Sequence, residues 1–284
     1  MKIGIFDSGV GGLIIARAIR KAMPEYDYVY LGDTKRVPYG NRSHETVYEF
    51  TREGVNYLFK KENCAIVIIA CNTASAKALR RIQQEYLVKN FPDRKVLGVL
   101  VPTAEECAKY KKVGIIGTSG TIASNSFPIE IKKILARRSL GGVGNTKIKV
   151  FQNPAPMLVP LAEAGEKALA IPFLKKYLMP LVAKHPDAIA LGCTHYPFYK
   201  KEIRKILLAQ RSLGGVGGKN IKIISQDEIV PKKLKEYFAR HLEIEQNLSK
   251  NGKAKILVTD ITKNVEKLTK EWFGQNTKPE LVKL

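Results

Sequence analysis

Short apolar runs alternate with longer amphipathic stretches along the whole 284-residue chain. The apolar runs are typical of buried strands, and stretches with apolar residues three or four positions apart are typical of helices. This alternation predicts an α/β protein with mainly parallel sheets. The predicted strands are 2–6, 27–31, 65–70, 96–100, 113–117, 147–152, 188–191, 221–225 and 256–259. The predicted helices are 13–23, 43–61, 74–86, 103–110, 122–136, 165–183 (one or two helices), 199–208, 228–240 and 261–273.

Polar clusters follow several of the predicted strands at their carboxyl ends. They occupy residues 7–12, 32–34, 71–73, 117–121 and 193–195. Right-handed crossovers between parallel strands place the carboxyl ends along one edge of a sheet, where ligands bind. Two α/β units whose ligand edges face each other would form a cleft, and we expect the active site in that cleft.

Two of the four cysteines end an apolar run and begin a helix-like stretch. Cys71 is followed by Asn72 and Thr73, and Cys193 by Thr194 and His195. Backbone N–H groups and the positive end of a helix favour a thiolate at such a position. One thiol could remove a proton from one face of a small substrate while the other supplies a proton to the opposite face. That arrangement inverts a stereocentre and needs neither metal nor cofactor.

The ordinary interpretation of a free cysteine is a small buried hydrophobe. We keep it for Cys64, at the edge of an apolar run, and for Cys107, within the helix-like stretch TAEECAKY. Cys71 and Cys193 are each followed directly by polar residues, which argues against this interpretation for them. A cysteine that only fills apolar space has no need of hydrogen-bonding neighbours.

The other motifs each have an ordinary structural alternative. DSGVGGL at residues 7–13 suggests an anion cradle, or a tight turn in which Asp7 caps the following helix. GTSGT at residues 117–121 suits a carboxylate, or merely caps a helix. VPYG at residues 37–40 is also a common turn, Glu163 a common solvated helix residue, and His195 a common hydrogen-bonded side chain. Their occurrence together at strand ends favours a functional site.

Composition narrows the possible partners. The chain carries 48 Lys and Arg against 26 Asp and Glu, a net charge of +22. Such a charge suits nucleic acid or a lysine-rich solvated surface. The basic residues are scattered and no nucleic-acid-reading motif accompanies them, so we expect no nucleic-acid partner. The chain has no bilayer-length apolar run, no signal-peptide core, no C-x-x-C pair and no metal-like His/Cys spacing. We therefore expect a cytoplasmic protein with reduced thiols, no membrane partner and no metal.

One segment occurs almost unchanged twice. ILARRSLGGVG at 134–144 reappears as LLAQRSLGGVG at 207–217, although the flanking sequences differ. Lengthening a surface loop costs little free energy. We interpret the copies as inserted glycine-rich loops near 138–144 and 211–217, on the helix-to-strand side and dispensable for chemistry.

Six motifs, taken together and in order, resemble the bacterial glutamate racemase family. They are DSGVGGL, LGDTKRVPYG, ACNTAS, GTSGT, VPLAEAG and LGCTHYP, and the resemblance runs from residue 3 to about residue 273. It implies two pseudo-symmetric α/β domains: residues 1–98 completed by 220–284, and residues 99–219. It also implies cofactor-independent interconversion of L- and D-glutamate, which supplies peptidoglycan synthesis. We also expect a homodimer.

The resemblance implies a role for each motif residue. Cys71 and Cys193 would be the two acid/base thiols, taking the proton from D- and L-glutamate respectively. Asp7 would assist Cys71, and His195 with Glu163 would assist Cys193. The residues expected to hold the glutamate ammonium and carboxylates are Asp7, Ser8, Tyr39, Gly40, Asn72, Thr73, Thr118, Thr121, Thr194 and His195.

The sequence departs from the family pattern at one position, and two alternative functions stay open. Ala155 stands where many relatives have a cysteine, a position that is not catalytic in the family. A related two-cysteine racemase of aspartate or a hydantoin is the alternative within enzymes. A basic nucleic-acid-binding regulator is the alternative from another class.

Overall fold

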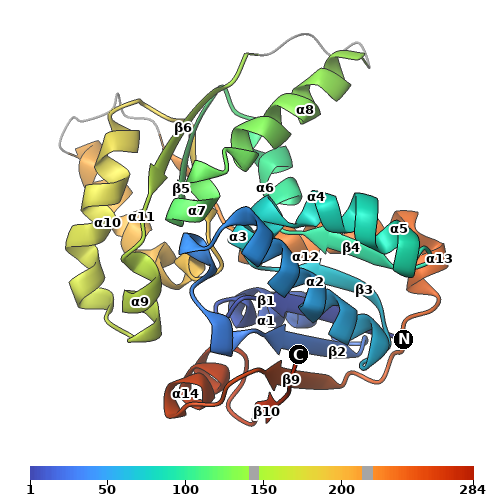
Figure 1. The fold of residues 1–284 in the computed structure, drawn as a ribbon. Coiled ribbons are helices and arrows are strands. Elements are labelled where there is room, and N and C mark those ends of the chain that lie inside the picture. The colour runs from blue at the N-terminus through green and yellow to red at the C-terminus, as the bar shows by residue number, and fades with distance from the viewer. Residues whose placement is uncertain (141–146, 213–219) are drawn as a thin grey trace. The chain divides into compact units, whose positions relative to one another are not determined.

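The chain forms two compact units in the computed structural model, which describes residues 1–140, 147–212 and 220–284 (Figure 1). The first unit combines Met1–Val99 with Val230–Leu284, and the second is Leu100–Ile229. The first unit is therefore built from both ends of the chain, with the second inserted in its sequence.

A six-stranded parallel sheet forms the centre of the first unit, in the order β10-β9-β2-β1-β3-β4. In Figure 1 the red β9 lies beside the blue β2, from the opposite end of the sequence. The strands are β1 Lys2–Asp7, β2 Tyr28–Gly32, β3 Cys64–Ile69, β4 Lys95–Gly98, β9 Ala254–Val258 and β10 Glu280–Leu281. The helices are α1 Gly12–Ala22, η1 Thr34–Arg36, η2 Tyr39–Asn41, α2 His44–Lys60, α3 Asn72–Lys77, α4 Leu79–Arg81, a π-helix Ile82–Tyr86, α5 Leu87–Asn90, α13 Leu242–Glu245 and α14 Lys263–Trp272.

A four-stranded parallel sheet forms the centre of the second unit, in the order β6-β5-β7-β8. Its strands are β5 Lys112–Gly117, β6 Lys149–Pro154, β7 Ala188–Gly192 and β8 Lys222–Ile224. Its helices are α6 Leu100–Cys107, α7 Ser119–Ala123, α8 Ser126–Leu140, α9 Leu158–Glu163, α10 Lys167–Val182, η4 Tyr196–Tyr199 and α11 Lys200–Ser212. The helix α12, Gln226–Arg240, begins in this unit and ends in the first.

Burial explains why these segments form strands and helices. All residues of β3 and β7 are buried, as expected for parallel strands covered on both faces. In α1 the buried residues Leu13, Ile15, Ala16 and Ile19 lie on one stripe of the helix. Burying each such Leu or Ile side chain contributes roughly 1.5–3 kcal/mol. The hydrophobic pattern that predicted the elements is thus the pattern that forms the two cores.

The predicted α/β architecture with parallel sheets is confirmed, with differences at element ends. The predicted strand 96–100 ends at Gly98, because Leu100 already begins α6. The predicted helix 74–86 is divided into α3, α4 and the π-helix. The chain returns to the first unit at Val230 rather than at residue 220, because β8 pairs with β7.

The duplicated segments begin differently from the surface loops expected for them. Residues 138–140 are the last of α8, and residues 211 and 212 are the last of α11. The rest of the two predicted loops, 141–144 and 213–217, lies outside the described residues. Within the described part of the chain, no helix is long and apolar enough to cross a membrane.

Candidate active site

Cys71 lies at the point where β3 gives way to α3. It is the N-cap residue of α3, and its Sγ accepts a hydrogen bond from the Ala74 backbone N–H at 3.4 Å. The Ser8 hydroxyl donates a second hydrogen bond to the same sulfur at 3.3 Å. The side chain is only 7% exposed. Because both donors stabilise negative charge on the sulfur, this environment favours a thiolate.

Asp7 ends β1 and shapes the turn that presents Ser8. It is 1% exposed, and its Oδ1 accepts a hydrogen bond from the Gly9 backbone N–H at 2.9 Å. The ordinary alternative for Asp7, a cap on α1, is not observed, because α1 has Gly11 at its N-cap and no side-chain capping bond. Gly12 is required nearby, since a Cβ there would come within 2.6 Å of the Asp7 Cβ.

Tyr39 belongs to a buried hydrogen-bond network around Asp33. The Tyr39 hydroxyl donates to Asp33 Oδ2 at 2.5 Å, and Arg36 Nε donates to the same oxygen at 2.6 Å. Thr259 donates to Asp33 Oδ1 at 2.9 Å. Burial and the negative charge of Asp33 raise the pKa of Tyr39 far above its usual value. The tyrosine hydroxyl therefore keeps its proton and is oriented by a carboxylate.

Asp33 was not among the predicted site residues, although the motif that contains it was noted. The usable signal was a carboxylate directly after a strand whose five residues are all buried. Of the other residues predicted here, Asn72 and Thr73 lie buried in the first turn of α3, and Gly40 lies partly exposed in η2.

Cys193, His195 and Glu163 form a chain of contacts in the second unit. Cys193 follows β7, and its Sγ lies 3.8 Å from Nδ1 of His195. The other ring nitrogen of His195, Nε2, lies 2.9 Å from Oε1 of Glu163 at the end of α9. Cys193 is 5% exposed and His195 is 7% exposed. The ring therefore connects a buried sulfur to a carboxylate that lies partly in solvent.

The charge on His195 follows from these contacts. Burial alone lowers the pKa of an imidazole, but the hydrogen bonds to Cys193 and Glu163, and the charges of both, outweigh burial and raise the pKa of His195 to about 10. His195 is therefore an imidazolium at neutral pH and can donate a proton toward the sulfur and another toward the carboxylate. A thiolate at Cys193 is stabilised by this cation.

The hydroxyls expected to bind carboxylates lie in the same unit as Cys193. Thr118 caps α7 by accepting a hydrogen bond from the Thr121 N–H at 3.2 Å, and the two hydroxyls lie 2.9 Å apart. The capping alternative for GTSGT is thus observed. Thr194 is 3% exposed, beside Cys193 in sequence. Substrate binding by these threonines stays a prediction.

Cys64 and Cys107 contrast with the two candidate thiols. Both are fully buried, and burial raises the pKa of each to about 12, so both remain protonated thiols at neutral pH. This agrees with the interpretation of these two as small hydrophobes. All four cysteines lie in the described part of the chain, and none forms a disulfide. Within the described residues, no group of three or more His, Cys, Asp or Glu side chains could hold a metal ion.

The structure thus gathers the predicted residues into two groups, one in each unit. The first contains Asp7, Ser8 and Cys71 together with Asn72 and Thr73. The second contains Glu163, Cys193, Thr194 and His195, with Thr118 and Thr121 at the end of β5. Every one of these residues lies at or beyond the carboxyl end of a strand, except Glu163, which ends a helix.

Comparison with known proteins gives a consistent result. A family described as Asp/Glu/Hydantoin racemase matches residues 14–216. Glutamate racemase of Aquifex aeolicus is 35% identical over 286 residues, which cover 99% of this chain and 97% of the relative. Among solved structures, glutamate racemase of Francisella tularensis in complex with D-glutamate matches with a TM-score of 0.82 and 30% identity, covering 99% of this chain and 97% of that one.

A second solved structure agrees with the first. The glutamate racemase isoform RacE1 of Bacillus anthracis matches with a TM-score of 0.83 and 31% identity, covering 100% of this chain and 97% of that one. The sequence and structural matches extend over nearly the full length of both partners. The chain therefore belongs to the Asp/Glu/Hydantoin racemase family and, within it, to the glutamate racemases.

Proposed function

We propose that this chain interconverts L- and D-glutamate by a two-base mechanism in which Cys71 and Cys193 are the acid/base thiols. One observation carries the proposal. The two cysteines that follow strands have neighbours that stabilise a thiolate, whereas Cys64 and Cys107 are fully buried and their pKa is raised by burial. The full-length similarity to glutamate racemases supports glutamate as the substrate.

The chemistry follows from the demands of removing an α-proton. In the L-to-D direction, the Cys193 thiolate takes the proton from Cα and the electron pair stays on Cα, shared with the adjacent carboxylate. The Cys71 thiol then gives its proton to the opposite face of Cα. Each thiol is therefore a base in one direction and an acid in the other, so one must start as thiolate and the other as thiol. Hydrogen bonds to the substrate carboxylate stabilise the carbanion.

The neighbours of the thiols have positioning roles in this mechanism. The His195 imidazolium stabilises the Cys193 thiolate, and Glu163 holds the ring and keeps it charged. On the other side, Ser8 donates to the Cys71 sulfur, and Asp7 fixes the turn that carries Ser8. We propose that the ten predicted binding residues contact the bound glutamate.

The wider biological role is proposed from the family. D-glutamate is the product that the family supplies to peptidoglycan synthesis, and we propose the same role here. We propose a cytoplasmic homodimer with no nucleic-acid or membrane partner. Sedimentation at micromolar concentration tests the dimer. A gel shift on duplex DNA at physiological salt tests the expectation of no nucleic-acid partner. Non-specific binding has a dissociation constant of about 10⁻⁴–10⁻⁶ M there, so sub-micromolar affinity would contradict the expectation.

Half-reactions test the assignment of the two thiols. With a glutamate analogue that carries a leaving group at its β-carbon, elimination requires only the first proton removal. Serine is a far poorer base than cysteine at neutral pH, because a hydroxyl ionises less readily than a thiol. Cys71→Ser should therefore retain elimination activity on the L-analogue and lose it on the D-analogue. Cys193→Ser should show the reverse pattern. Racemisation should collapse in both variants.

Matched controls and a substrate panel complete the test. Cys64→Ala and Cys107→Ala should keep racemisation within tenfold of the wild type, provided that circular dichroism shows folded protein. Equal loss with both enantiomers in both serine variants would refute the two-base assignment. Faster turnover of aspartate or a hydantoin than of glutamate would instead identify the chain as one of the other racemases that the family name covers.

A further inference from the structure

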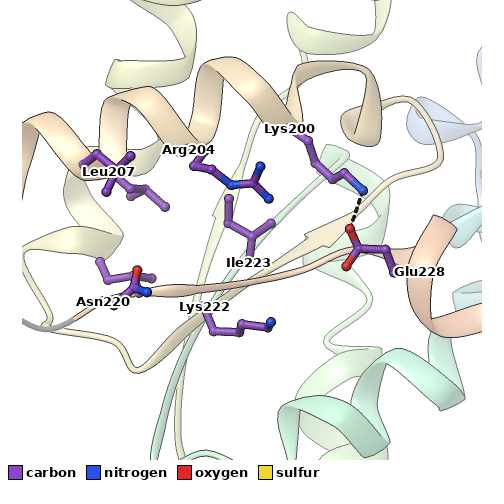
Figure 2. A pocket seen from close by; sticks show the side chains of 9 residues that line it. Lys200, Arg204, Leu207, Asn220, Lys222, Ile223 and Glu228 are labelled. Atoms are coloured by element: carbon purple, nitrogen blue, oxygen red, sulfur yellow. Dashed lines mark hydrogen bonds and ion pairs between the residues drawn. The ribbon is translucent and has the colours of Figure 1, made fainter.

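A pocket lies in the second unit among residues that the proposed mechanism does not use (Figure 2). Its volume is about 250 Å³, and it is bounded by α11, by β8 with the two residues before it, and by the start of α12. The residues that line it are Lys200, Arg204, Leu207, Leu208, Asn220, Ile221, Lys222, Ile223 and Glu228. None of them is a predicted catalytic or glutamate-binding residue.

The charges in the pocket do not balance. Lys200 is paired with Asp227 at 2.8 Å and with Glu228 at 2.6 Å, so its charge is compensated. Arg204 and Lys222 have no ion pair or side-chain hydrogen bond with any described residue. Figure 2 shows the Arg204 side chain extending from α11 into the space beside Ile223, on the side of Lys200. The pocket therefore presents a guanidinium whose hydrogen-bond donors have no carboxylate partner among the described residues.

Four of the nine residues that line the pocket are leucine or isoleucine. Leu207 and Leu208 come from α11, and Ile221 and Ile223 from β8 and the residue before it. Ile223 points toward α11 in Figure 2, on the side where Arg204 lies. Small-molecule sites combine this kind of apolar wall with a few polar groups that fix the orientation of the ligand. A guanidinium suits a carboxylate or phosphate, because its planar donors can form two parallel hydrogen bonds.

We propose that this pocket binds a small organic anion, with a carboxylate or phosphate at Arg204 and an apolar body against Leu207, Leu208 and Ile223. The site is distinct from the cysteine groups. The helix α11 that carries Arg204 follows directly after η4, the turn next to His195. A ligand of this size held by one guanidinium and a short apolar wall should bind with a dissociation constant of about 1 mM.

A titration of ¹⁵N-labelled protein tests the proposal. Phenyl phosphate is the probe, with inorganic phosphate and phenol as probes that each carry one half of its chemistry. Saturable shifts should appear at residues 200–208 and 220–224 and at the Arg204 Nε–H resonance. Phenyl phosphate should bind at least threefold more tightly than inorganic phosphate, and phenol should give no saturable shifts there. Equal affinity for phenyl and inorganic phosphate would refute the role of the apolar wall.

Variants on α11 separate a specific site from the general positive field. Arg204→Gln should weaken phenyl phosphate at least tenfold, and Arg204→Lys should give an intermediate loss because it keeps the charge without the planar fork. Lys205→Gln is the matched control, since Lys205 is the next residue on the same helix, is exposed and does not line the pocket. It should change the affinity less than twofold. Equal effects of Arg204→Gln and Lys205→Gln, or shifts that do not saturate, would overturn the proposal.

Discussion

Asp27 joins the two sequence segments of the first unit, and its replacement by Asn should destabilise that unit measurably. The carboxylate lies just before β2, where its Oδ1 accepts hydrogen bonds from the backbone N–H groups of Lys253 at 2.9 Å and Asn251 at 3.3 Å. Its Oδ2 accepts from the Asn251 side chain at 2.7 Å. These bonds hold the turn that leads into β9. An asparagine keeps one acceptor oxygen but turns an NH₂ group toward a donor.

The magnitude follows from the pKa of Asp27. Burial alone would raise it, but the hydrogen bonds from Asn251, Ser249 and Lys253 outweigh burial and lower the pKa from 3.8 to about 2. A difference of this size corresponds to at most about 2.5 kcal/mol of stability at neutral pH, because one pKa unit is about 1.4 kcal/mol. Solvent screening reduces this, and we expect Asp27→Asn to cost about 1–2 kcal/mol.

The sign of the pH dependence is fixed by the lowered pKa. The stabilisation is present above the unfolded pKa of about 4 and is lost as the pH falls through about 2. By pH 3 roughly half of this stabilisation should be lost, because the carboxylate is then largely protonated in the unfolded chain but still largely ionised in the folded one. The difference between wild type and Asp27→Asn should accordingly shrink between pH 7 and pH 3.

Urea unfolding followed by tryptophan fluorescence measures this directly. The chain has 1 tryptophan, Trp272, which is 5% exposed in α14 of the first unit, so the signal reports that unit. Asp93→Asn is the matched control, because it makes the same chemical change at an exposed position. A loss below about 0.5 kcal/mol at pH 7, or an equal loss at pH 7 and pH 3, would contradict the argument, since surface changes usually stay within that range.

Three further predictions concern the thiols, His195 and the duplicated segments. At pH 8, iodoacetamide should modify Cys64 and Cys107 at least a hundredfold more slowly than Cys71 and Cys193 by peptide mass mapping, because a thiol with a pKa of about 12 forms little thiolate there; equal rates would contradict this. Glu163→Gln should lower the pKa of His195 from about 10, measured by NMR of the labelled imidazole, because it removes a carboxylate that raises it; an unchanged pKa would show that Glu163 does not control the ring. Replacing 141–144 or 213–217 by a short Gly-Ser linker should leave turnover within tenfold, and a hundredfold loss in folded protein would refute the dispensable-loop interpretation.

The sequence predicted the elements whose signal is local. Strands such as β3 are buried on both faces, so a continuous apolar run marks them, and the thiols were found because polar residues follow such runs. The strand β10 gave no signal, because it has two residues and both are exposed. The π-helix was also missed, since it differs from an α-helix only in its backbone hydrogen bonds.

Features that depend on distant partners were beyond sequence reasoning. The strand β8 joins the second unit through its pairing with β7, which is distant in the sequence. The Asp33 network includes Thr259, which is 226 positions away in the chain, and Asp27 binds Lys253 over the same separation. No periodicity or spacing encodes such pairs, because nothing in the local pattern identifies which distant donor a carboxylate meets. The two thiols carried a local signal, whereas the distant partners of Asp27 and Asp33 carried none.

The split of the first unit between both ends of the chain has a consequence for synthesis on the ribosome. The partner that covers β2, strand β9, begins only at residue 254, after the entire second unit has been made. At 5–20 residues per second the apolar β2 would wait for roughly 10–45 s with an open edge. Unpaired apolar edges of this kind promote aggregation. The newborn chain should therefore depend on chaperones during this interval, whereas the uninterrupted second unit can fold as soon as it emerges.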